Sequence, residues 1–244
     1  MPTGASDVLR VVSWNIRDLL DDRWAVRRVV RALSPDVLCL QEAPRRLPGV
    51  WRNRRLARDC GLRFAGGGRT SGGTALMLAP RVGVRSLTAA RLPVRGPFTR
   101  TRGLVVAELV VDRDDGLGGR RVSLTVGCVH LPLEPDRRVR HSQIAAAALA
   151  ARPEPRILCG DLNEVPGSPA WRVLEAAVGP DPAPDAAPTF PAGRADKRLD
   201  VVLVGAGLSV VAYGDGEADP DDVRRASDHV PVVADLAVPW GSGA

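Results

Sequence analysis

The sequence predicts an α/β fold in which mixed β-sheets lie inside and helices lie outside. Three observations carry this prediction. Residues 9–42 have the pattern strand, helix, strand; residues 73–131 have short strands separated by turn residues; and helical patterns occur at three places along the chain. A single domain spanning residues 1–244 is expected, because only about 50 residues follow the Pro- and Asp-rich loop 179–188, too few for a separate core.

The first two strands and the helix between them have the clearest patterns. LRVVSW (9–14) and DVLCLQE (36–42) are apolar runs typical of buried strands. Between them, WAVRRVVRAL (24–33) repeats apolar residues at helical spacing, and Ser34-Pro35 ends this helix.

The middle of the chain predicts hairpins. The candidate strands are GTALMLAP (73–80), RGLVVAELVVD (102–112) and GRRVSLTVGCVHL (119–131), with DRDDGLGG (112–119) as the turn between the last two. The preceding GGGRTSGG (66–73) is Gly-rich but lacks the lysine of a phosphate-binding loop, so we expect a mobile loop there.

The last hundred residues return to alternating helices and strands. A helix is expected from Asp136 through Ala151, and another from Ser168-Pro169 to Gly179, because Ser caps helices, Pro suits the first helical position and Gly suits the end. The expected strands of this part are RILCG (156–160), RLDVVLV (198–204) and HVPVVADL (229–236).

Several conspicuous side chains are expected to have structural roles only. Trp24 and Trp171 are predicted to pack into the core, His141 on an Arg-rich helix to be solvated, and the acidic run 217–222 to form a solvated loop. The cysteines contain no CxxC pair, which argues against a structural zinc site and favours small buried hydrophobes. They are Cys39, Cys60, Cys128 and Cys159.

The charge of the chain leaves two interpretations open. A net charge of +6 and a pI of about 10.0 favour acidic partners such as nucleic acid. However, Lys197 is the only lysine, and an excess of Arg beside abundant Ala, Gly and Pro is typical of a genome-wide coding bias. No basic segment followed by a long apolar run opens the chain, and no run reaches the roughly 20 residues of a membrane span. We therefore expect a cytoplasmic monomer without stable membrane association.

Polar side chains lie at the ends of six of the expected strands. If these ends meet at one edge of the packed sheets, four carboxylates converge and repel each other unless a cation lies among them. Carboxylate and amide oxygens favour Mg²⁺ first and Mn²⁺ next, and a phosphate ester is the natural substrate of such a site. The residues are Asn15, Glu42, His130, Asp161 with Asn163, Asp200, and Asp228 with His229.

These residues lie in motifs that resemble the metal-dependent endonuclease/exonuclease/phosphatase family, which includes pancreatic-type deoxyribonuclease, abasic-site endonucleases and neutral sphingomyelinase. The matching pieces follow the family's order over nearly the whole chain. They are WN (14–15), PDVLCLQE (35–42), RG (102–103), VHL (129–131), GDLNEVPGSP (160–169), TFP (189–191), RLD (198–200) and SDHVPV (227–232). The resemblance implies a four-layer sandwich, with two packed mixed β-sheets between outer helices and the site at one end.

The resemblance also implies a role for each residue. Glu42 is the principal Mg²⁺ ligand with help from Asn15, and Asp228 is a second ligand. Asp161 orients or deprotonates the attacking water, and Asn163 holds the phosphate. His229 contacts the scissile phosphate while Asp200 fixes its ring. His130 donates to a phosphoryl oxygen or to the leaving group, and Arg102 reaches a phosphate as its strand begins.

Three functions remain open at this point. The first is a Mg²⁺-dependent phosphodiesterase acting on DNA or RNA. The second is a hydrolase of a small or lipid phosphoester, since Val202 and Gly73-Thr74 replace residues common in the family and leave the substrate subclass open. The third is a binding domain without catalysis on the same fold. Taken singly, each polar residue would also suit a turn, a cap or a surface pair.

Overall fold

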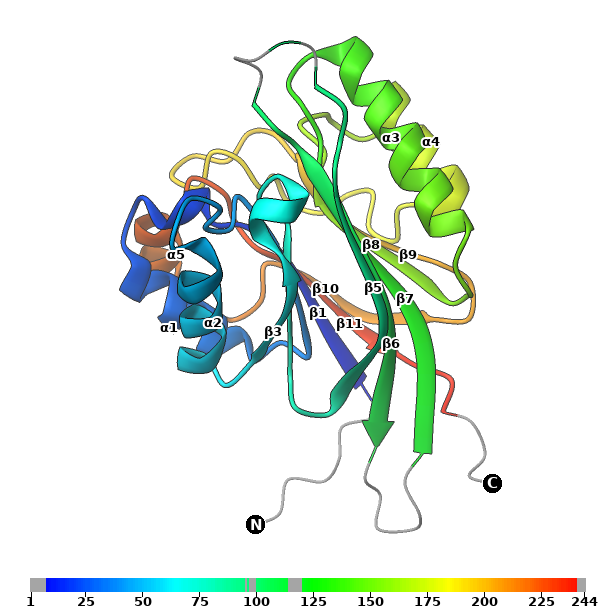
Figure 1. Ribbon diagram of the computed structural model, residues 1–244, viewed down its shortest axis with the longest axis horizontal. Coiled ribbons are helices and arrows are strands. Elements are labelled where there is room, and N and C mark those ends of the chain that lie inside the picture. The colour runs from blue at the N-terminus through cyan, green and yellow to red at the C-terminus, as the bar shows by residue number, and fades with distance from the viewer. Residues whose placement is uncertain (1–7, 95, 97–99, 114–119, 241–244) are drawn as a thin grey trace.

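The structure is a computed structural model that describes residues 8–94, 96, 100–113 and 120–240. Two β-sheets pack face to face in the middle of the molecule, one group of helices covers the outer face of the first sheet, and α3 (Pro135–Ala150) and α4 (Pro169–Val178) cover the second (Figure 1). The predicted four-layer sandwich is confirmed.

The first sheet contains six strands in the order β10-β11-β1-β2-β4-β3. β1 lies at its centre, parallel to β2 and antiparallel to β11, so the first and last strands of the chain are neighbours. The strands are β1 (Val8–Asn15), β2 (Val37–Gln41), β3 (Arg63–Gly67), β4 (Ala75–Leu78), β10 (Ser209–Gly214) and β11 (Val232–Ala237).

The second sheet contains five strands in the order β5-β6-β7-β8-β9. Only β7 and β8 are parallel, and the other neighbours are antiparallel. The register of β6 with β7 runs to the pair Arg113 and Arg120, as a hairpin requires, while most of the turn predicted at 112–119 lies outside the described residues. The strands are β5 (Val82–Arg91), β6 (Gly103–Arg113), β7 (Arg120–His130), β8 (Arg156–Asp161) and β9 (Asp200–Val204).

Three clusters of buried apolar side chains separate the layers. The first lies between the two sheets and includes Val11 and Val105. The second packs the first sheet against α1 (Arg23–Leu33), α2 (Gly49–Asp59) and α5 (Pro220–Ala226), and the third packs the second sheet against α3 and α4. Burial of these clusters is the main favourable contribution to folding.

The local signals at helix ends explain where several helices start and stop. The side chain of Asp22 accepts hydrogen bonds from the first amides of α1, and Ser34 ends this helix in the left-handed conformation. Pro169 opens α4, and Gly179 follows its last residue. No helix in the described part of the chain is both long and apolar enough to cross a membrane.

The structure contains elements that the sequence patterns did not predict. Two are helices, α2 and α5, and the second of these begins inside the acidic run expected to be a loop. Three are strands, β3, β5 and β10, each at or next to a sheet edge and with many exposed side chains. Edge strands carry little apolar signal because one side faces solvent.

Three further predictions, about Trp24, His141 and residues 66–73, were wrong. Trp24 is 50% exposed and stacks on Arg27 instead of packing into the core, whereas Trp171 is buried as expected. His141 is buried and its Nε2 lies 2.8 Å from the carbonyl of Pro93.

Residues 66–73 do not form a mobile loop. They end β3 and form a short 3₁₀ turn, η2 (Gly68–Ser71), that is held by several hydrogen bonds. The hydroxyl of Ser71 donates to the carbonyl of Thr74 at 2.6 Å, and Gly72 and Gly73 are buried. Gly72 has a φ of +61°, and a Cβ there would lie 2.5 Å from the backbone of Arg102, so only glycine fits this contact.

Candidate active site

Strand register brings the predicted site residues together at one end of the two sheets. Asn15, the last residue of β1, is paired with Gln41, directly before Glu42. In the second sheet, Asp161 has register partners on both sides: His130 on β7 and Asp200 on β9. Parallel neighbours end at the same edge of a sheet, which explains why residues distant in sequence meet here.

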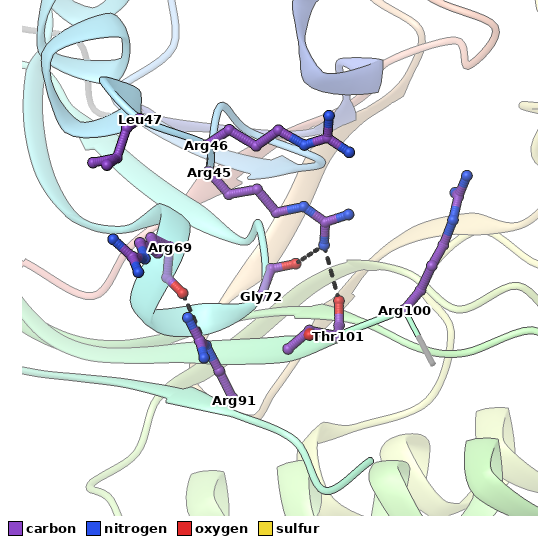
Figure 2. Close-up of a pocket in the computed structure, with 8 residues that line it drawn as sticks. All are labelled: Arg45, Arg46, Leu47, Arg69, Gly72, Arg91, Arg100 and Thr101. Atoms are coloured by element: carbon purple, nitrogen blue, oxygen red, sulfur yellow. Dashed lines mark hydrogen bonds between the residues drawn. The ribbon is translucent and has the colours of Figure 1, made fainter. Parts of the chain in front are cut away.

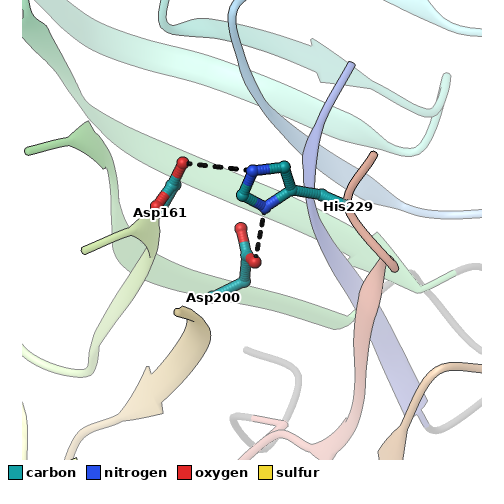
Figure 3. A group of neighbouring side chains, drawn as sticks. All are labelled: Asp161, Asp200 and His229. Atoms are coloured by element: carbon teal, nitrogen blue, oxygen red, sulfur yellow. Dashed lines mark hydrogen bonds and ion pairs between the residues drawn. The ribbon is translucent and has the colours of Figure 1, made fainter. Parts of the chain in front are cut away.

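His229 lies between two buried carboxylates of the site. Its Nδ1 lies 2.8 Å from Oδ2 of Asp200, and its Nε2 lies 3.8 Å from Oδ2 of Asp161 (Figure 3). Burial alone would lower the pKa of His229, but the attraction of Asp200, followed by that of Asp161, outweighs burial and raises it to about 9. The imidazole is therefore protonated at neutral pH and donates through Nδ1 to Asp200.

Hydrogen bonds hold the carboxylate of Asp200 in the position where it accepts from His229. The hydroxyl of Thr189 donates to its Oδ2 at 2.7 Å, and the same hydroxyl accepts hydrogen bonds from the backbone of Leu199 and Asp200. Burial raises the pKa of Asp200, and the attraction of His229 opposes that rise. The ring of Phe190 packs on His229 with centroids 4.8 Å apart.

Asp161 is the centre of the hydrogen-bond network. Its Oδ2 accepts from Nδ2 of Asn15 at 2.9 Å and lies 3.2 Å from Nε2 of His130, and its Oδ1 accepts from the backbone amide of Asn163 at 3.0 Å. Burial would raise the pKa of Asp161, but His130 and His229 outweigh burial and lower it well below its usual range. Asp161 is therefore ionised throughout the physiological pH range.

His130 connects Asp161 to a buried arginine. Its Nδ1 lies 3.0 Å from Nη1 of Arg102, and a guanidinium can only donate, so Nδ1 accepts and the proton of the neutral ring lies on Nε2, facing Asp161. Burial and the charge of Arg102 lower the pKa of His130 and keep it neutral. Arg102 in turn donates to Oε1 of Glu42 at 3.3 Å.

A continuous series of side-chain contacts thus joins eight of the nine predicted site residues. The series runs, in order, through Glu42, Arg102, His130, Asp161, His229 and Asp200. Asn15 and Asn163 both contact Asp161. The ninth is Asp228. Its carboxylate is 3.6 Å from Nε of Arg17. It acts on the other site residues only through its negative charge, which contributes to the raised pKa of His229.

Asn163 lies against the protein on both sides of its amide. Its Nδ2 donates to the carbonyl of Leu131 at 2.9 Å and lies 3.2 Å from Nε2 of His130. Its backbone has a φ of +50°, and Glu42 has a φ of +48°. Residues other than glycine rarely adopt this left-handed conformation, and such strained residues concentrate at functional sites.

Sequence reasoning assigned no role to several residues that support the site. Thr189 and Phe190 hold Asp200 and His229, and both lie in the TFP motif, which was the available signal. Ser227, in the SDH motif, donates to the backbone carbonyl of Asn15 at 2.6 Å and accepts from the amide of His229. The indole of Trp14 donates to the carbonyl of His229 at 2.8 Å. Ser227 and Trp14 together fix the SDH segment to the end of β1.

The oxygen ligands that a divalent cation prefers are present at this end of the molecule. Asp161, Asp200 and His229 offer ligand atoms within 4.8 Å of one another, which makes them a possible metal-binding group. The protonated ring of His229, however, has no free lone pair for a metal. Both nearby arginines face Oε1 of Glu42, and its Oε2 has no hydrogen-bond partner among the residues that the structure describes. Burial would raise the pKa of Glu42, but His130 and Arg102 lower it, so the carboxylate is ionised and suits a hard cation.

The comparison with protein families agrees with this geometry. The model of the Endonuclease/Exonuclease/phosphatase family matches residues 12–229, and the chain belongs to this family. Its members are phosphoester hydrolases that generally depend on a divalent metal, so the protein is a hydrolase of phosphoesters. No curated protein gives a significant sequence match.

Solved structures show the same fold. A mannosyl-6-phosphatase of Bacteroides thetaiotaomicron is 18% identical with a TM-score of 0.72, over 93% of this chain and 99% of that chain. The human Nocturnin catalytic domain is 17% identical with a TM-score of 0.64, over 97% of each chain. ANGEL2, a 2′,3′-cyclic phosphatase, is 16% identical with a TM-score of 0.65, over 94% and 95%.

Proposed function

We propose that this protein is a Mg²⁺-dependent phosphodiesterase that acts on nucleic acid, with Mn²⁺ as a possible substitute ion. One observation carries the proposal: His229, held by Asp200, and Asp161 are connected through His130 and Arg102 to the partly exposed carboxylate of Glu42. The raised pKa of His229 and the lowered pKa of Asp161 favour the charged form of each side chain. Phosphoester hydrolysis requires a cationic side chain that binds the phosphate, an anionic side chain that orients the attacking water and a carboxylate that binds the metal ion. The chain acts as one domain, since these groups come from segments that extend from the end of β2 to the residues before β11.

Glu42, with the amide oxygen of Asn15 and an oxygen of Asp161, would hold the ion. When bound, Mg²⁺ neutralises the phosphoryl oxygens and stabilises the leaving oxygen. Mg²⁺ usually takes only one or two protein carboxylates. Among the described residues of the site, Glu42 has an oxygen without a hydrogen-bond partner, and so does Asp200, whose Oδ1 is buried. A role for Asp228 as a further ligand would require it to leave Arg17.

His229 and Asp161 act on the two sides of the reacting phosphorus. The distance of 3.8 Å from Nε2 of His229 to Asp161 is too long for a hydrogen bond, so this N–H can donate to a phosphoryl oxygen of the substrate. Asp161 orients the attacking water through its oxygens. Its strongly lowered pKa makes it a poor base, which favours orientation of the water over removal of its proton.

His130 acts as a positioning residue in this proposal. Both of its ring nitrogens face protein groups, Arg102 on one side and Asp161 on the other, and its side chain is 1% exposed. Arg102 carries the positive charge nearest to Glu42 and helps to neutralise the phosphate. Asn163, just after β8, would have to give up the hydrogen bond of its Nδ2 to Leu131 in order to donate this group to the phosphate.

A second candidate is hydrolysis of a small phosphoester. The mannosyl-6-phosphatase and the 2′,3′-cyclic phosphatase share this fold, and that likeness favours a small substrate. The basic charge of the protein favours nucleic acid instead. A lipid phosphoester remains the least supported version, because it would need an apolar surface that enters a membrane.

The test is hydrolysis of a substrate panel with Mg²⁺, with Mn²⁺ and with a chelator. The panel contains supercoiled plasmid, abasic DNA, single-stranded RNA, an aryl phosphodiester and a sugar phosphate. Wild-type protein should cleave the nucleic acids, and both the chelator and Glu42→Gln should remove at least 99% of the activity, a loss on the order of 100-fold or more. Glu217→Gln, the same change at an exposed residue, is the matched control. Turnover of the sugar phosphate or the aryl diester without cleavage of any nucleic acid would replace the first candidate by the second.

A further inference from the structure

A hollow lined by five arginines lies next to the proposed active site. We call it the arginine groove, and it has a volume of about 520 Å³. Its arginines come from the segment after β2, from η2, from the end of β5 and from the residues before β6, and Figure 2 shows them around Gly72 and Thr101. They are Arg45, Arg46, Arg69, Arg91 and Arg100.

Most charges of the arginine groove have no carboxylate partner among the described residues. Four of its five arginines make no ion pair with any carboxylate in the part of the chain that the structure describes, and the exception, Arg100, lies 3.9 Å from Glu42. Arg45 and Arg46 act on the partly buried Asp18 only through their charge.

Several arginines elsewhere are neutralised by carboxylates. Arg10 pairs with Asp235 at 2.7 Å, and Arg28 pairs with Asp222 at 2.6 Å. Other arginines without an ion pair among the described residues, such as Arg140 and Arg172, are exposed on α3 and α4. The arginine groove is distinguished by the gathering of five cations around one hollow. Like charges in one hollow repel each other, and an anion that enters it relieves this repulsion.

The groove is also built to keep its shape. Nη1 of Arg45 donates to the carbonyls of Gly72 and Thr101 at 3.2 Å and 3.1 Å (Figure 2). The Nε of Arg91 donates to the carbonyl of Arg69 at 3.1 Å. These bonds join η2 and Gly72 to β5 and to the residues before β6, so the remaining N–H groups of Arg45 and Arg91 are held in place for a ligand.

The groove borders the reaction centre. Arg100 lines it and faces Oε1 of Glu42, and Gly72 packs on the backbone of Arg102. A volume of about 520 Å³ falls in the range of small-molecule sites, roughly 300–1,000 Å³, and far exceeds a single phosphate. The side chain of Leu47, 83% exposed, adds an apolar wall. The groove therefore has room for a phosphate together with the organic group that carries it.

We propose that the arginine groove binds a second phosphate group of the substrate, one that is not hydrolysed, while the reacting phosphate lies between Glu42 and His229. This inference rests on the proposed function, because it places the substrate across the same site. Arginine is well suited to the task, since its planar fork makes paired hydrogen bonds to phosphate. The second phosphate belongs either to the next nucleotide of a strand or to a small molecule with two phosphates.

Binding without catalysis is the first test. Fluorescence anisotropy of a labelled oligodeoxythymidylate of eight nucleotides is measured in chelator, where no metal supports hydrolysis. Arg46→Ala/Arg69→Ala should weaken binding at least tenfold and reduce its dependence on salt. Arg140→Ala/Arg172→Ala, which removes two exposed arginines of α3 and α4, is the matched control and should bind as wild type does. Equal affinity of both double variants, or no binding by the wild type, overturns the proposal.

Competition identifies the source of the phosphate. Adenosine 3′,5′-bisphosphate and inorganic phosphate are added to the wild-type complex with the labelled strand. Displacement by the bisphosphate at concentrations where inorganic phosphate has no effect shows that two phosphates on a small molecule suffice, while resistance to both shows that the groove binds a strand. Displacement by inorganic phosphate and bisphosphate at the same concentration overturns the proposal, because one phosphate would then satisfy the whole site.

Activity separates this inference from the proposed function. Two substrates are compared for Arg46→Ala/Arg69→Ala: a dinucleotide with a terminal phosphate, and the aryl diester, which has one phosphate. The fold decrease in kcat/KM should be at least ten times larger for the dinucleotide than for the aryl diester. A parallel loss on both substrates refutes the groove as a second phosphate site. A further outcome is that the wild type turns over no phosphoester in Mg²⁺ while Arg46→Ala/Arg69→Ala still binds the labelled strand more weakly than the wild type does. In that case the proposed function fails and the groove remains a phosphate site.

Discussion

Replacement of Asp200 by Asn tests whether a protonated His229 is needed for catalysis. The change keeps the shape of the side chain and removes the carboxylate that lies 2.8 Å from Nδ1 of His229. The carboxylates raise the pKa of His229 from its usual value of 6.5 to about 9. That shift corresponds to about 3 kcal/mol of interaction that favours the charged ring, and Asp200 is the largest favourable contributor.

The expected loss of activity depends on pH in a defined way. With a pKa of about 9, roughly 90% of the wild-type ring is protonated at pH 8. In Asp200→Asn, burial is no longer outweighed and the pKa falls to about 6 or below, so only about 1% is protonated at pH 8. The kcat/KM for an aryl phosphodiester in Mg²⁺ should therefore fall about 100-fold at pH 8 and only a few-fold near pH 5.5. The falling limb of the pH–rate profile should move from near pH 9 to near pH 6.

The assay pairs this profile with an NMR titration of the imidazole in metal-free protein. Asp185→Asn, the same chemical change on an exposed loop, controls for the loss of one negative charge. The thermal unfolding midpoint of each variant shows whether it is folded. A folded Asp200→Asn protein whose profile still falls near pH 9 would refute the assignment of a catalytic cation to His229.

Two further predictions concern stability. Gly72→Ala should destabilise the protein by about 3 kcal/mol in urea unfolding, because the new Cβ would lie 2.5 Å from the backbone of Arg102. Gly61 has a similar φ of +74° but open space around it, so Gly61→Ala should cost only about 1 kcal/mol. Equal losses of stability would contradict the steric argument. The raised pKa of His229 should add about 3 kcal/mol of stability below pH 6.5, and this should be lost as the pH rises through 9, which unfolding free energies across that range would show. Unfolding free energies that stay level from pH 6 to pH 10 would contradict the charged state of His229.

The strands that carry the site could be predicted because they are buried on both faces. β2, β8 and β9 are continuous apolar runs, and each has a polar residue at the end where it leaves the core. Such a residue is costly to bury without a partner, so its position at a strand end is informative. The family motifs add the expectation that these ends converge, and the register of β7, β8 and β9 brings them together.

The missing elements have weak local signals. β5 and β10 lie at sheet edges and alternate between exposed and half-buried residues. α2 buries only part of one face among several arginines, and Trp51, on its surface, is 57% exposed. Their stability comes from tertiary packing that no local pattern reports.

The pairing of side chains within the site was equally hidden. His130 lies between Arg102 and Asp161, which are 28 residues before it and 31 residues after it, and only the register of β6, β7 and β8 decides this. The buried state of His141 depends on the carbonyl of Pro93, which a sequence pattern cannot indicate. The arginine groove likewise joins residues from four separate segments.

The pairing of β1 with β11 has a consequence for the time at which activity arises. Asn15 and Trp14 depend on Ser227 and His229 for their contacts, so the reaction centre closes only when the last strand has joined the first. On the ribosome, a growing chain holds Glu42 and Asp161 long before it holds His229. The candidate site is therefore complete only after residues 227–229 have been synthesised and β11 has paired with β1.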